Sequence, residues 1–350
     1  MLNEILVLIL AWSILCTAKH ELDGGSRPNW LINVPPEFER RPNNTNMKRF
    51  ELSDVQAETS MLAHVGNIVD ERLKHVDGFT DGEFVDVIEH FFWGKAGGIS
   101  VELGALDGSW RTKSQTEELE KFGWKRILID GNPAYRQTMP KYSPNAFCVL
   151  AAICADDGSN RVVHFQPREY TGGILEFMGK DFLKDYHKEI YEASNPRGDV
   201  SSIDWSSSSI QKLGILPIDC VPLHVIFRRA HVQHINFFIL DVEGGEFEVL
   251  QSISWSHTSF DVLCIETEKA NRPEGLEAKI STFLRDKGYL VYGHIGRNSW
   301  YVRSDFVPAP RPGVPKDCFN GARKSAHEDS NWVHKRRDKF VRCETKGTTG

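Results

Sequence analysis

The sequence has no CxxC pair and no cluster of cysteines and histidines at zinc-binding spacing, so we expect no structural zinc site. It has no visible internal repeat and no G-x-G-x-x-G motif, and the second absence argues against a nicotinamide dinucleotide site. The formal net charge of −6 gives no overall reason to expect nucleic acid as a partner. What is present is a chain of 350 residues, 40% hydrophobic and 26% charged, which is enough for one large α/β domain or two modest ones.

The N-terminal apolar segment, residues 5–16, is shorter than the roughly 20 residues that span a membrane. Its length suits the core of a signal peptide, and the small residues up to Ala18 form an acceptable cleavage site. Because no Lys or Arg precedes the segment, an uncleaved signal anchor in the membrane is the alternative. We therefore predict a signal peptide or anchor at residues 1–18 and a location in the secretory pathway. The glycosylation sequon at 43–45 fits exposure to the lumen.

Composition divides the rest of the chain into three parts. Residues 19–52 contain a stretch rich in Pro, Asn and charge, which predicts a linker or stalk. Residues 53–305 form the predicted folded domain, and the apolar period at 53–93 predicts a helical lead-in. Residues 306–350 carry ten Lys/Arg against five Asp/Glu. A solvated basic tail is expected there, and contact with anionic lipid or glycan is the alternative.

Seven cysteines are present, and six would remain after removal of Cys16 with the signal. An even number permits disulfides in an oxidising compartment. Cys318 and Cys343 flank the basic tail and could bridge it. Cys154 and Cys264 lie in or beside predicted core strands, where buried free thiols are equally expected.

Strand and helix patterns alternate from residue 99 onward, which predicts an α/β sheet with helices on both faces. The expected strands are 99–103, 126–129, 147–153, 161–165, 234–240 and 262–266, followed by an antiparallel pair at 289–292 and 299–303. The expected helices are 81–93, 112–122, 133–139, 222–229, 245–253 and 274–287. Residues 166–219 are the least regular part, with helical pieces at 177–193, and we expect a variable insertion near the substrate there.

Two predicted strands end in turns that suit a cationic cofactor. Gly104 and Gly108 in VELGALDG let the backbone turn sharply and approach a ligand closely. Glu102 in the same stretch would repel a pyrophosphate, whereas it would attract the ammonium and sulfonium groups of S-adenosylmethionine. Asp130, at the end of the next strand in RILIDGNP, can accept both hydrogen bonds of a ribose diol. The alternative is an ordinary turn and cap at 130–133.

Two further turns carry acids. Asp156 follows the strand at 147–153 and could reach an adenine amino group, although Asp-Gly at this point is equally a simple turn. The apolar run 237–240 ends at Asp241, which is followed by Glu243 and a glycine pair. Open α/β sheets bind ligands at the carboxyl ends of their strands, so these acids are candidate site residues. The alternative is that they cap the helix that follows.

Six segments, in this order over residues 97–303, resemble the FkbM-type methyltransferase family: ISVELGALDG, GWKRILIDGNP, AAICADDGS, INFFILDVEGGEFEVLQSI, DVLCIETE and FLRDKGY. The resemblance implies a Rossmann-like methyltransferase fold, with a mostly parallel seven-stranded sheet, helices on both faces and an antiparallel closing strand. It also implies S-adenosylmethionine as the cofactor and methyl transfer to a hydroxyl oxygen of a sugar or polyketide-like acceptor. One departure is the pair Asp130 and Gly131, where many relatives have Glu-Pro.

The resemblance implies roles for the residues that match its motifs. Glu102 and Gly104 would face the methionine part of the cofactor, Asp130 the ribose and Asp156 the adenine. Asp241 would lie beside the methyl group and the acceptor. The full predicted cofactor site is Glu102, Gly104, Asp107, Asp130, Asn132, Asp156 and Asp241; the predicted catalytic residues are Asp241 and Glu243, with Glu266 and His234 as substrate contacts. No metal site is predicted, since nothing in the spacing of these residues demands one.

The leading hypothesis is a methyltransferase of the secretory pathway that acts on a glycan or a small molecule. The main alternative is a non-catalytic trafficking or adaptor protein that retains the fold, and a nicotinamide-dependent oxidoreductase is a distant third. The joint presence of Glu102, Gly104, Asp130 and Asp241 favours a working cofactor pocket, because an adaptor has no need of that set.

Overall fold

The computed structural model describes residues 28–39, 59–60, 63–64, 83–109, 112, 114–155, 161–168, 170–194, 200–267, 275–295 and 297–312. Several predicted features lie outside these residues: the signal segment, most of the helical lead-in, the sequon, Asp156, and the tail after residue 312 with Cys318 and Cys343. Within the described residues, no helix combines the length and the apolar character needed to cross a membrane. The predicted signal or anchor stays a prediction.

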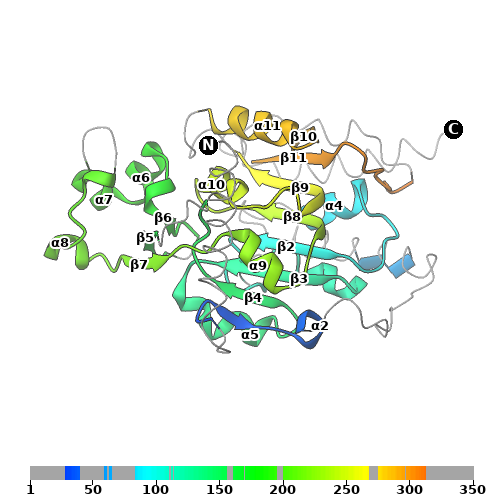
Figure 1. Ribbon diagram of the computed structural model, residues 1–350, viewed down its shortest axis with the longest axis horizontal. Coiled ribbons are helices and arrows are strands. Elements are labelled where there is room, and N and C mark those ends of the chain that lie inside the picture. Colours follow the sequence, from blue (N-terminus) through cyan, green and yellow to red (C-terminus); the bar gives the residue numbers. More distant parts are fainter. Residues whose placement is uncertain are drawn as a thin grey trace, which may run out of the picture.

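The core is an eight-stranded sheet (Figure 1). Its strands, in spatial order, are β1 (Leu31–Asn33), β4 (Phe147–Leu150), β3 (Lys125–Asp130), β2 (Ile99–Leu103), β8 (His234–Leu240), β9 (Ser259–Glu266), β11 (Asn298–Arg303) and β10 (Tyr289–Ile295). The strands from β4 to β9 run parallel, and β11 and β10 form the expected antiparallel pair at one edge. The predicted α/β class is confirmed. Strand order reverses between β2 and β8, and this reversal is where open α/β sheets bind ligands.

The sheet has one strand more than the seven we expected. The additional strand, β1, pairs antiparallel with β4 and buries Leu31. The short helix α2 (Pro36–Glu39) follows and packs Phe38 against Phe147, with 5.3 Å between the ring centroids. Both elements fall within residues 19–52, which we predicted to be a linker. Elements of three or four residues are too short to show a hydrophobic period, so composition alone misled the prediction.

Helices cover both faces of the sheet, as predicted. One face is packed by α9 (Leu223–Arg229), α10 (Glu246–Gln251) and α11 (Leu276–Asp286). The other is packed by α4 (Glu83–His90), the 3₁₀ helices η2 (Glu117–Phe122) and η3 (Pro133–Arg136), and α5 (Thr138–Tyr142). Neighbouring residues of β8 face opposite sides, since Phe237 belongs to the apolar cluster of α4 and Phe238 to that of α9. The run 237–240 of β8 is apolar throughout because both faces of the strand are buried.

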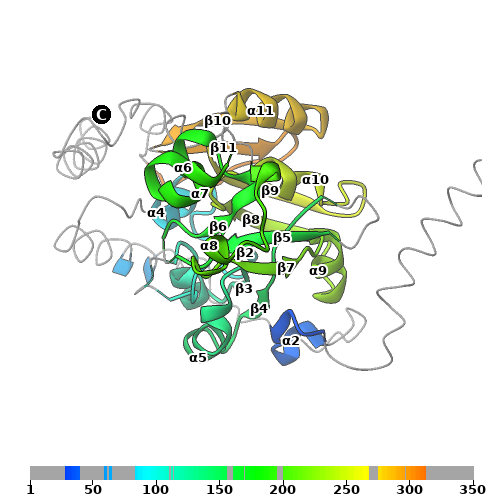
Figure 2. The same cartoon turned by 90° about the vertical axis from the view of Figure 1, so that its left-hand side faces the viewer.

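Residues 161–219, here called the insert, form a small unit beside the main sheet (Figures 1 and 2). Three antiparallel strands make its sheet: β5 (Val162–Gln166), β6 (Gly173–Ile174) and β7 (Leu216–Asp219). Its helices are η4 (Leu175–Phe177), α6 (Lys180–Tyr186), α7 (Lys188–Ala193), η5 (Val200–Ser202) and α8 (Ser208–Gln211). They share an apolar cluster that includes Leu175 and Phe182. The irregular sequence pattern of this region therefore reflects short elements with a core of their own.

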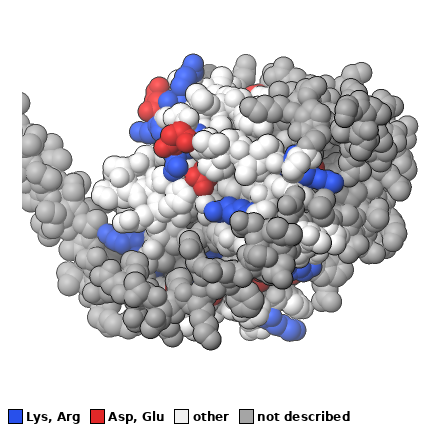
Figure 3. Space-filling view, turned by 90° about the vertical axis from the view of Figure 1, so that its right-hand side faces the viewer, with Lys and Arg blue, Asp and Glu red and all other residues white. Residues whose placement is uncertain are grey.

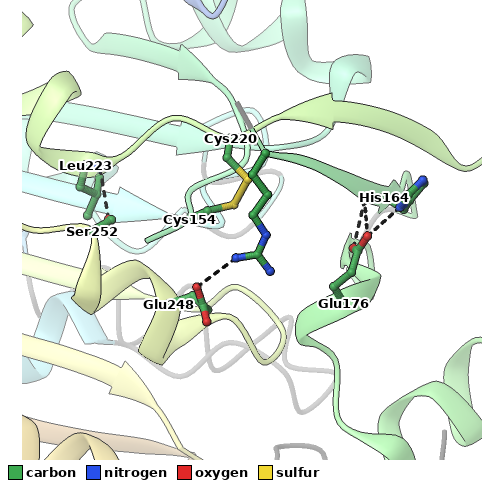
Figure 4. Close-up of a disulfide and its surroundings, with 8 residues drawn as sticks. Cys154, His164, Glu176, Cys220, Leu223, Glu248 and Ser252 are labelled. Carbon is green, nitrogen blue, oxygen red and sulfur yellow. Dashed lines mark hydrogen bonds and ion pairs between the residues drawn. A yellow bond between two sulfur atoms is a disulfide. The ribbon is translucent and has the colours of Figure 1, made fainter. Parts of the chain in front are cut away.

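A disulfide between Cys154 and Cys220 fastens the insert to the main sheet (Figure 4). Cys154 follows β4 and Cys220 follows β7, so the bridge closes the chain where the insert begins and ends. Nearby, Arg161 pairs with Glu248 of α10 at 3.6 Å. Of the two cysteines that we considered as buried thiols, Cys264 remains a buried thiol, whereas Cys154 is in the disulfide.

Figure 3 shows the charged side chains of one face of the molecule. On the face shown in Figure 3, Lys and Arg lie close to Asp and Glu at one corner and occur singly elsewhere. Mixed signs of this kind do not by themselves indicate a partner.

Candidate functional site

A cavity of about 500 Å³ lies between the carboxyl ends of the central strands and the insert. Its lining includes four residues that the sequence singled out for a cofactor: Glu102 of β2, Gly104 after it, Asp130 at the end of β3 and Asp241 after β8. The volume falls in the range of small-molecule sites, about 300–1,000 Å³. The predicted residues therefore share one hollow, at the reversal of strand order between β2 and β8.

Gly104 permits the close approach of the two strand ends that form this part of the lining. Its φ of +78° lies in the left-handed region, and a Cβ there would overlap the carbonyl oxygen of Asp241. The backbone N–H of Asp241 donates to the carbonyl of Leu103 at 3.2 Å, which ties the end of β8 to the end of β2. Any side chain at position 104 would push these ends apart.

Glu102 lines the cavity, yet much of its carboxylate is engaged within the protein. It accepts hydrogen bonds from Ser114 Oγ at 2.9 Å, Gln115 N at 2.9 Å and Thr116 Oγ1 at 2.5 Å. Arg126, which is 1% exposed, lies 3.7 Å away and balances the charge. Glu102 therefore holds the segment 114–116 in place, in addition to any contact with a ligand. This partner could not be predicted, because an Arg within an apolar strand does not reveal which acid it meets.

Asp130 stands where two turns meet. Its Oδ2 accepts the N–H of Leu106 at 2.8 Å, and its Oδ1 accepts the N–H of Asn132 at 2.7 Å. Burial raises the pKa of Asp130 to about 7, and the nearby charge of Glu102 adds to the rise. Hydroxyl donors or a cation in the cavity would favour the charged carboxylate and lower this pKa again. Asn132 lines the cavity as predicted, and its Oδ1 caps η3 by accepting the N–H of Ala134 at 3.0 Å.

The glycine at position 131, where the resembled pattern has proline, has a structural reason. A Cβ on Gly131 would lie 2.6 Å from Cε2 of Phe165, a residue of β5 in the insert. Both residues line the cavity. The insert thus packs directly on the turn after Asp130, and a proline ring at position 131 would displace it.

The glycine pair after Asp241 lets the insert contact this loop as well. Gly244 has a φ of +114°, and a Cβ there would lie 2.5 Å from the carbonyl oxygen of Phe177 in η4. Glu243, just before it, is also in the left-handed region, with a φ of 59°. The loop therefore follows a narrow path between β8 and the insert that only small residues permit at position 244.

Glu246 bonds the loop that leads into α10. Its Oε1 accepts the backbone N–H of Val242 at 3.3 Å and that of Gly244 at 3.2 Å. Asp241 and Glu243 both line the cavity. The alternative in which these two acids act only as helix caps is therefore disfavoured.

Three acids gather beside the cavity, because Asp241, Glu243 and Glu266 place carboxylate oxygens within 4.8 Å of one another. Glu266 is 3% exposed and pairs with Arg297 at 2.8 Å. Arg297 is among the residues that line the cavity, whereas Glu266 is not. Glu266 thus lies behind Arg297 in this structure, and its predicted contact with the substrate stays a prediction. By distance the three carboxylates could hold a cation, but Arg297 already supplies a positive charge, and we assign no metal.

His234, a predicted substrate contact, lies at the wrong end of its strand. It begins β8, whereas Asp241 follows the strand's other end. Its ring nitrogens contact Ser259 Oγ at 3.0 Å and Asp261 Oδ2 at 3.1 Å. A strand of this length separates the two positions by about 20 Å. Sequence proximity to the right strand was mistaken for proximity to the site.

Two more predicted cofactor residues have different outcomes. Asp107 is buried, and its Oδ1 accepts hydrogen bonds from Ser109 and Thr112, so it stabilises its own turn instead of lining the cavity. Asp156 lies outside the described residues. The insert's lining residues, considered below, were anticipated only as a region and not residue by residue.

Comparison with known proteins identifies the family. A family model described as "Methyltransferase FkbM domain" matches residues 102–291, which is more than half of the chain. The match begins at Glu102 and takes in Asp130, the insert and Asp241. A search of curated proteins found no match, and neither did a search of solved structures. The chain belongs to the FkbM methyltransferase family.

Proposed function

We propose that the protein transfers a methyl group from S-adenosylmethionine to a hydroxyl oxygen of a glycan or small molecule in the secretory pathway. The observation that carries this proposal is the shared cavity lined by Glu102, Gly104, Asp130 and Asp241. Its carboxylates suit a cofactor that bears an ammonium and a sulfonium group. Gly104 permits the close approach of the ends of β2 and β8, from which two of these carboxylates come.

When bound, S-adenosylmethionine supplies an electrophilic methyl group on a positively charged sulfur. Asp130, once ionised, accepts hydrogen bonds from the ribose hydroxyls. Asp241 accepts the proton that the acceptor hydroxyl loses as its oxygen bonds to the methyl carbon and the carbon–sulfur bond breaks. A general base of this kind contributes about 10²–10⁴-fold to the rate. Glu243, whose carboxylate lies within 4.8 Å of that of Asp241, holds the acceptor beside it.

The secretory location is supported by two features of the chain. The disulfide between Cys154 and Cys220 is of a kind that persists in oxidising compartments. The apolar segment 5–16 has the length of a signal-peptide core. Glycosylation of Asn43 tests this location: removal of N-glycans by a glycosidase should increase the electrophoretic mobility of the wild-type protein from cells but not that of Asn43→Gln.

Calorimetric titration with S-adenosylmethionine tests cofactor binding, and transfer of a labelled methyl group to a glycan panel tests the reaction. We expect Asp241→Asn to lower turnover about 10²–10⁴-fold. His234→Asn is the matched control, because His234 lies at the opposite end of the same strand. The turnover of this variant should equal that of the wild type. If Asp241→Asn changes neither cofactor affinity nor turnover, the assignment is wrong. A wild-type protein that binds no cofactor would favour the non-catalytic adaptor.

A further inference from the structure

The two sides of the cavity differ in charge. The side formed by the main sheet carries the carboxyl groups of Glu102, Asp130, Asp241 and Glu243. The insert supplies the opposite side, and among the described lining residues it contributes no Asp or Glu. Its lining residues are Phe165, Arg168, Tyr170, Thr171, Gly172, Ile174, Phe177, Phe182 and Tyr186. One side is thus acidic, and the other is aromatic with a single cation.

The cation on the insert side is Arg168, which follows β5. Its Nη1 donates a hydrogen bond to the backbone carbonyl of Tyr186 at the end of α6. Among the described residues, Arg168 forms no ion pair with a carboxylate. The other described cation in the lining, Arg297, is paired with Glu266 at 2.8 Å. Among the described lining residues, Arg168 is therefore the cation with which no carboxylate pairs, and its positive charge can meet a ligand.

Two tyrosines flank Arg168 at the solvent side of the cavity. Tyr170 is 49% exposed and Tyr186 is 36% exposed, although both line the cavity. Tyr186 rests on the buried ring of Phe182, with 4.7 Å between the centroids. Tyr186 therefore offers a supported, partly exposed apolar ring with a polar edge, which suits the C–H face of a sugar ring. Tyr170 adds a second exposed aromatic ring to the lining.

Contacts within the protein hold this wall in place. Its backbone turns tightly, since the N–H of Arg168 donates to the carbonyl of Gln166 at 2.9 Å and a Cβ on Gly172 would overlap the carbonyl of Arg168. His187 anchors the same turn through a 2.8 Å contact with the carbonyl of Thr171. The disulfide fastens the whole insert to the main sheet. A wall that is held in place loses little conformational entropy on binding.

Resting on the proposed function, we propose that the acceptor is a sugar that carries an anionic group, either a carboxylate or a sulfate ester. Arg168 binds the anion, Tyr170 and Tyr186 face the sugar ring, and the target hydroxyl reaches Asp241. The guanidinium matches the two oxygens of such a group in a bidentate pair. An anion in the reverse orientation would meet the carboxylates of the main sheet, so the charge pattern also fixes which end of the acceptor enters.

Binding of defined oligosaccharides to the full chain tests this proposal. We would titrate the protein, saturated with S-adenosylhomocysteine, with a hyaluronan fragment, a sulfated chondroitin fragment and a neutral chitin fragment. The wild type should bind at least one acidic fragment at least tenfold more tightly than the neutral one. The hyaluronan and chondroitin results distinguish a carboxylate from a sulfate as the preferred anion.

Variants locate the source of this preference. Arg168→Gln should remove the tenfold preference and leave affinity for the neutral fragment unchanged, while Arg168→Lys should retain part of it. Arg229→Gln, an exposed arginine of α9 outside the cavity lining, is the control and should behave like the wild type. Equal affinity for neutral and acidic fragments, no binding of either acidic fragment, or an unchanged preference in Arg168→Gln would each overturn the proposal. Thermal melting of each variant verifies that it is folded.

The same samples separate this inference from the proposed function. If the wild type binds S-adenosylmethionine but shows no acidic preference, the acceptor inference is wrong and the cofactor site stands. If the wild type binds no cofactor, the proposed function fails, and the charge preference of Arg168 is read from titrations without S-adenosylhomocysteine.

Discussion

The ionisation of Asp130 should control cofactor affinity. The carboxyl is 7% exposed, and burial raises its pKa to about 7 in the cofactor-free protein. Ribose hydroxyls donate more strongly to a carboxylate than to a neutral carboxylic acid, which also carries a competing proton. The cofactor therefore binds the deprotonated form, and its affinity should rise with pH until Asp130 is fully ionised.

The size of the effect follows from the pKa. With a pKa of about 7, about half of the carboxyl groups are ionised at pH 7 and about 1% at pH 5. Affinity for S-adenosylmethionine should therefore fall about fifty-fold between these two pH values, which corresponds to about 2 kcal/mol. Binding at pH 7 should also release about half a proton, because the bound cofactor lowers the pKa of this group.

Isothermal titration at half-unit steps from pH 5 to pH 7 measures the slope, and buffers with different ionisation enthalpies measure the released proton. Asp130→Asn should bind more weakly at pH 7 and lose most of the pH dependence. Asp219→Asn, an exposed acid at the end of β7, is the control and should keep the wild-type slope. A wild-type affinity that stays level from pH 5 to pH 7 would show that Asp130 does not bind the cofactor through its charged form.

Three further substitutions test how the site is held together. Gly244→Ala should lower the free energy of unfolding in urea by about 2–5 kcal/mol, because about 1–3 kcal/mol for a methyl group that meets a backbone carbonyl of the insert adds to the left-handed backbone penalty of about 1–2 kcal/mol. Gly214→Ala, with open space around it, should cost only the backbone penalty of about 1–2 kcal/mol, and equal losses in the two variants would contradict the contact. Cys220→Ala should lower the free energy of unfolding by up to about 4 kcal/mol, since the disulfide spans 66 residues. A reductant should lower the Tm of the wild type but not that of this variant. Arg126→Met should lower the free energy of unfolding by about 3–5 kcal/mol, because it leaves the buried carboxylate of Glu102 without this counter-charge. The double variant that also carries Glu102→Gln should regain part of this stability, and a double variant less stable than Arg126→Met would argue against the pair.

The central strands were predictable because burial on both faces leaves a plain signal. We predicted a strand at 234–240, and β8 has these bounds. The helix predicted at 112–122 is largely absent: only the 3₁₀ helix η2 forms, over its second half. The reason is tertiary, since the Ser114 and Thr116 hydroxyls and the Gln115 N–H are engaged by Glu102 in a non-helical segment. A partner that lies more than ten residues away leaves no trace in the local pattern.

The acids of the site were predictable for a similar reason, and its other side was not. Asp130 and Asp241 end buried parallel strands, so the carboxyl edge of the sheet necessarily brings them together. Arg168 and Tyr186 belong to the insert, whose short elements have no clear period. Their position in the lining of the same cavity depends on how the insert packs against the sheet, and no local sequence pattern encodes that packing. His234 shows the converse error, because it belongs to the right strand but to the wrong end.

The glycine pair after Asp241 lies where the acidic side of the cavity contacts the insert. Gly244 faces the carbonyl of Phe177, and a Cβ on Gly173 would lie 3.4 Å from Cβ of Glu243. The loop that carries the proposed base therefore touches the wall that carries the proposed acceptor site. The orientation of Asp241 then depends on the position of the insert. Changes in the insert that alter acceptor preference should consequently alter turnover as well, even where cofactor affinity is unchanged.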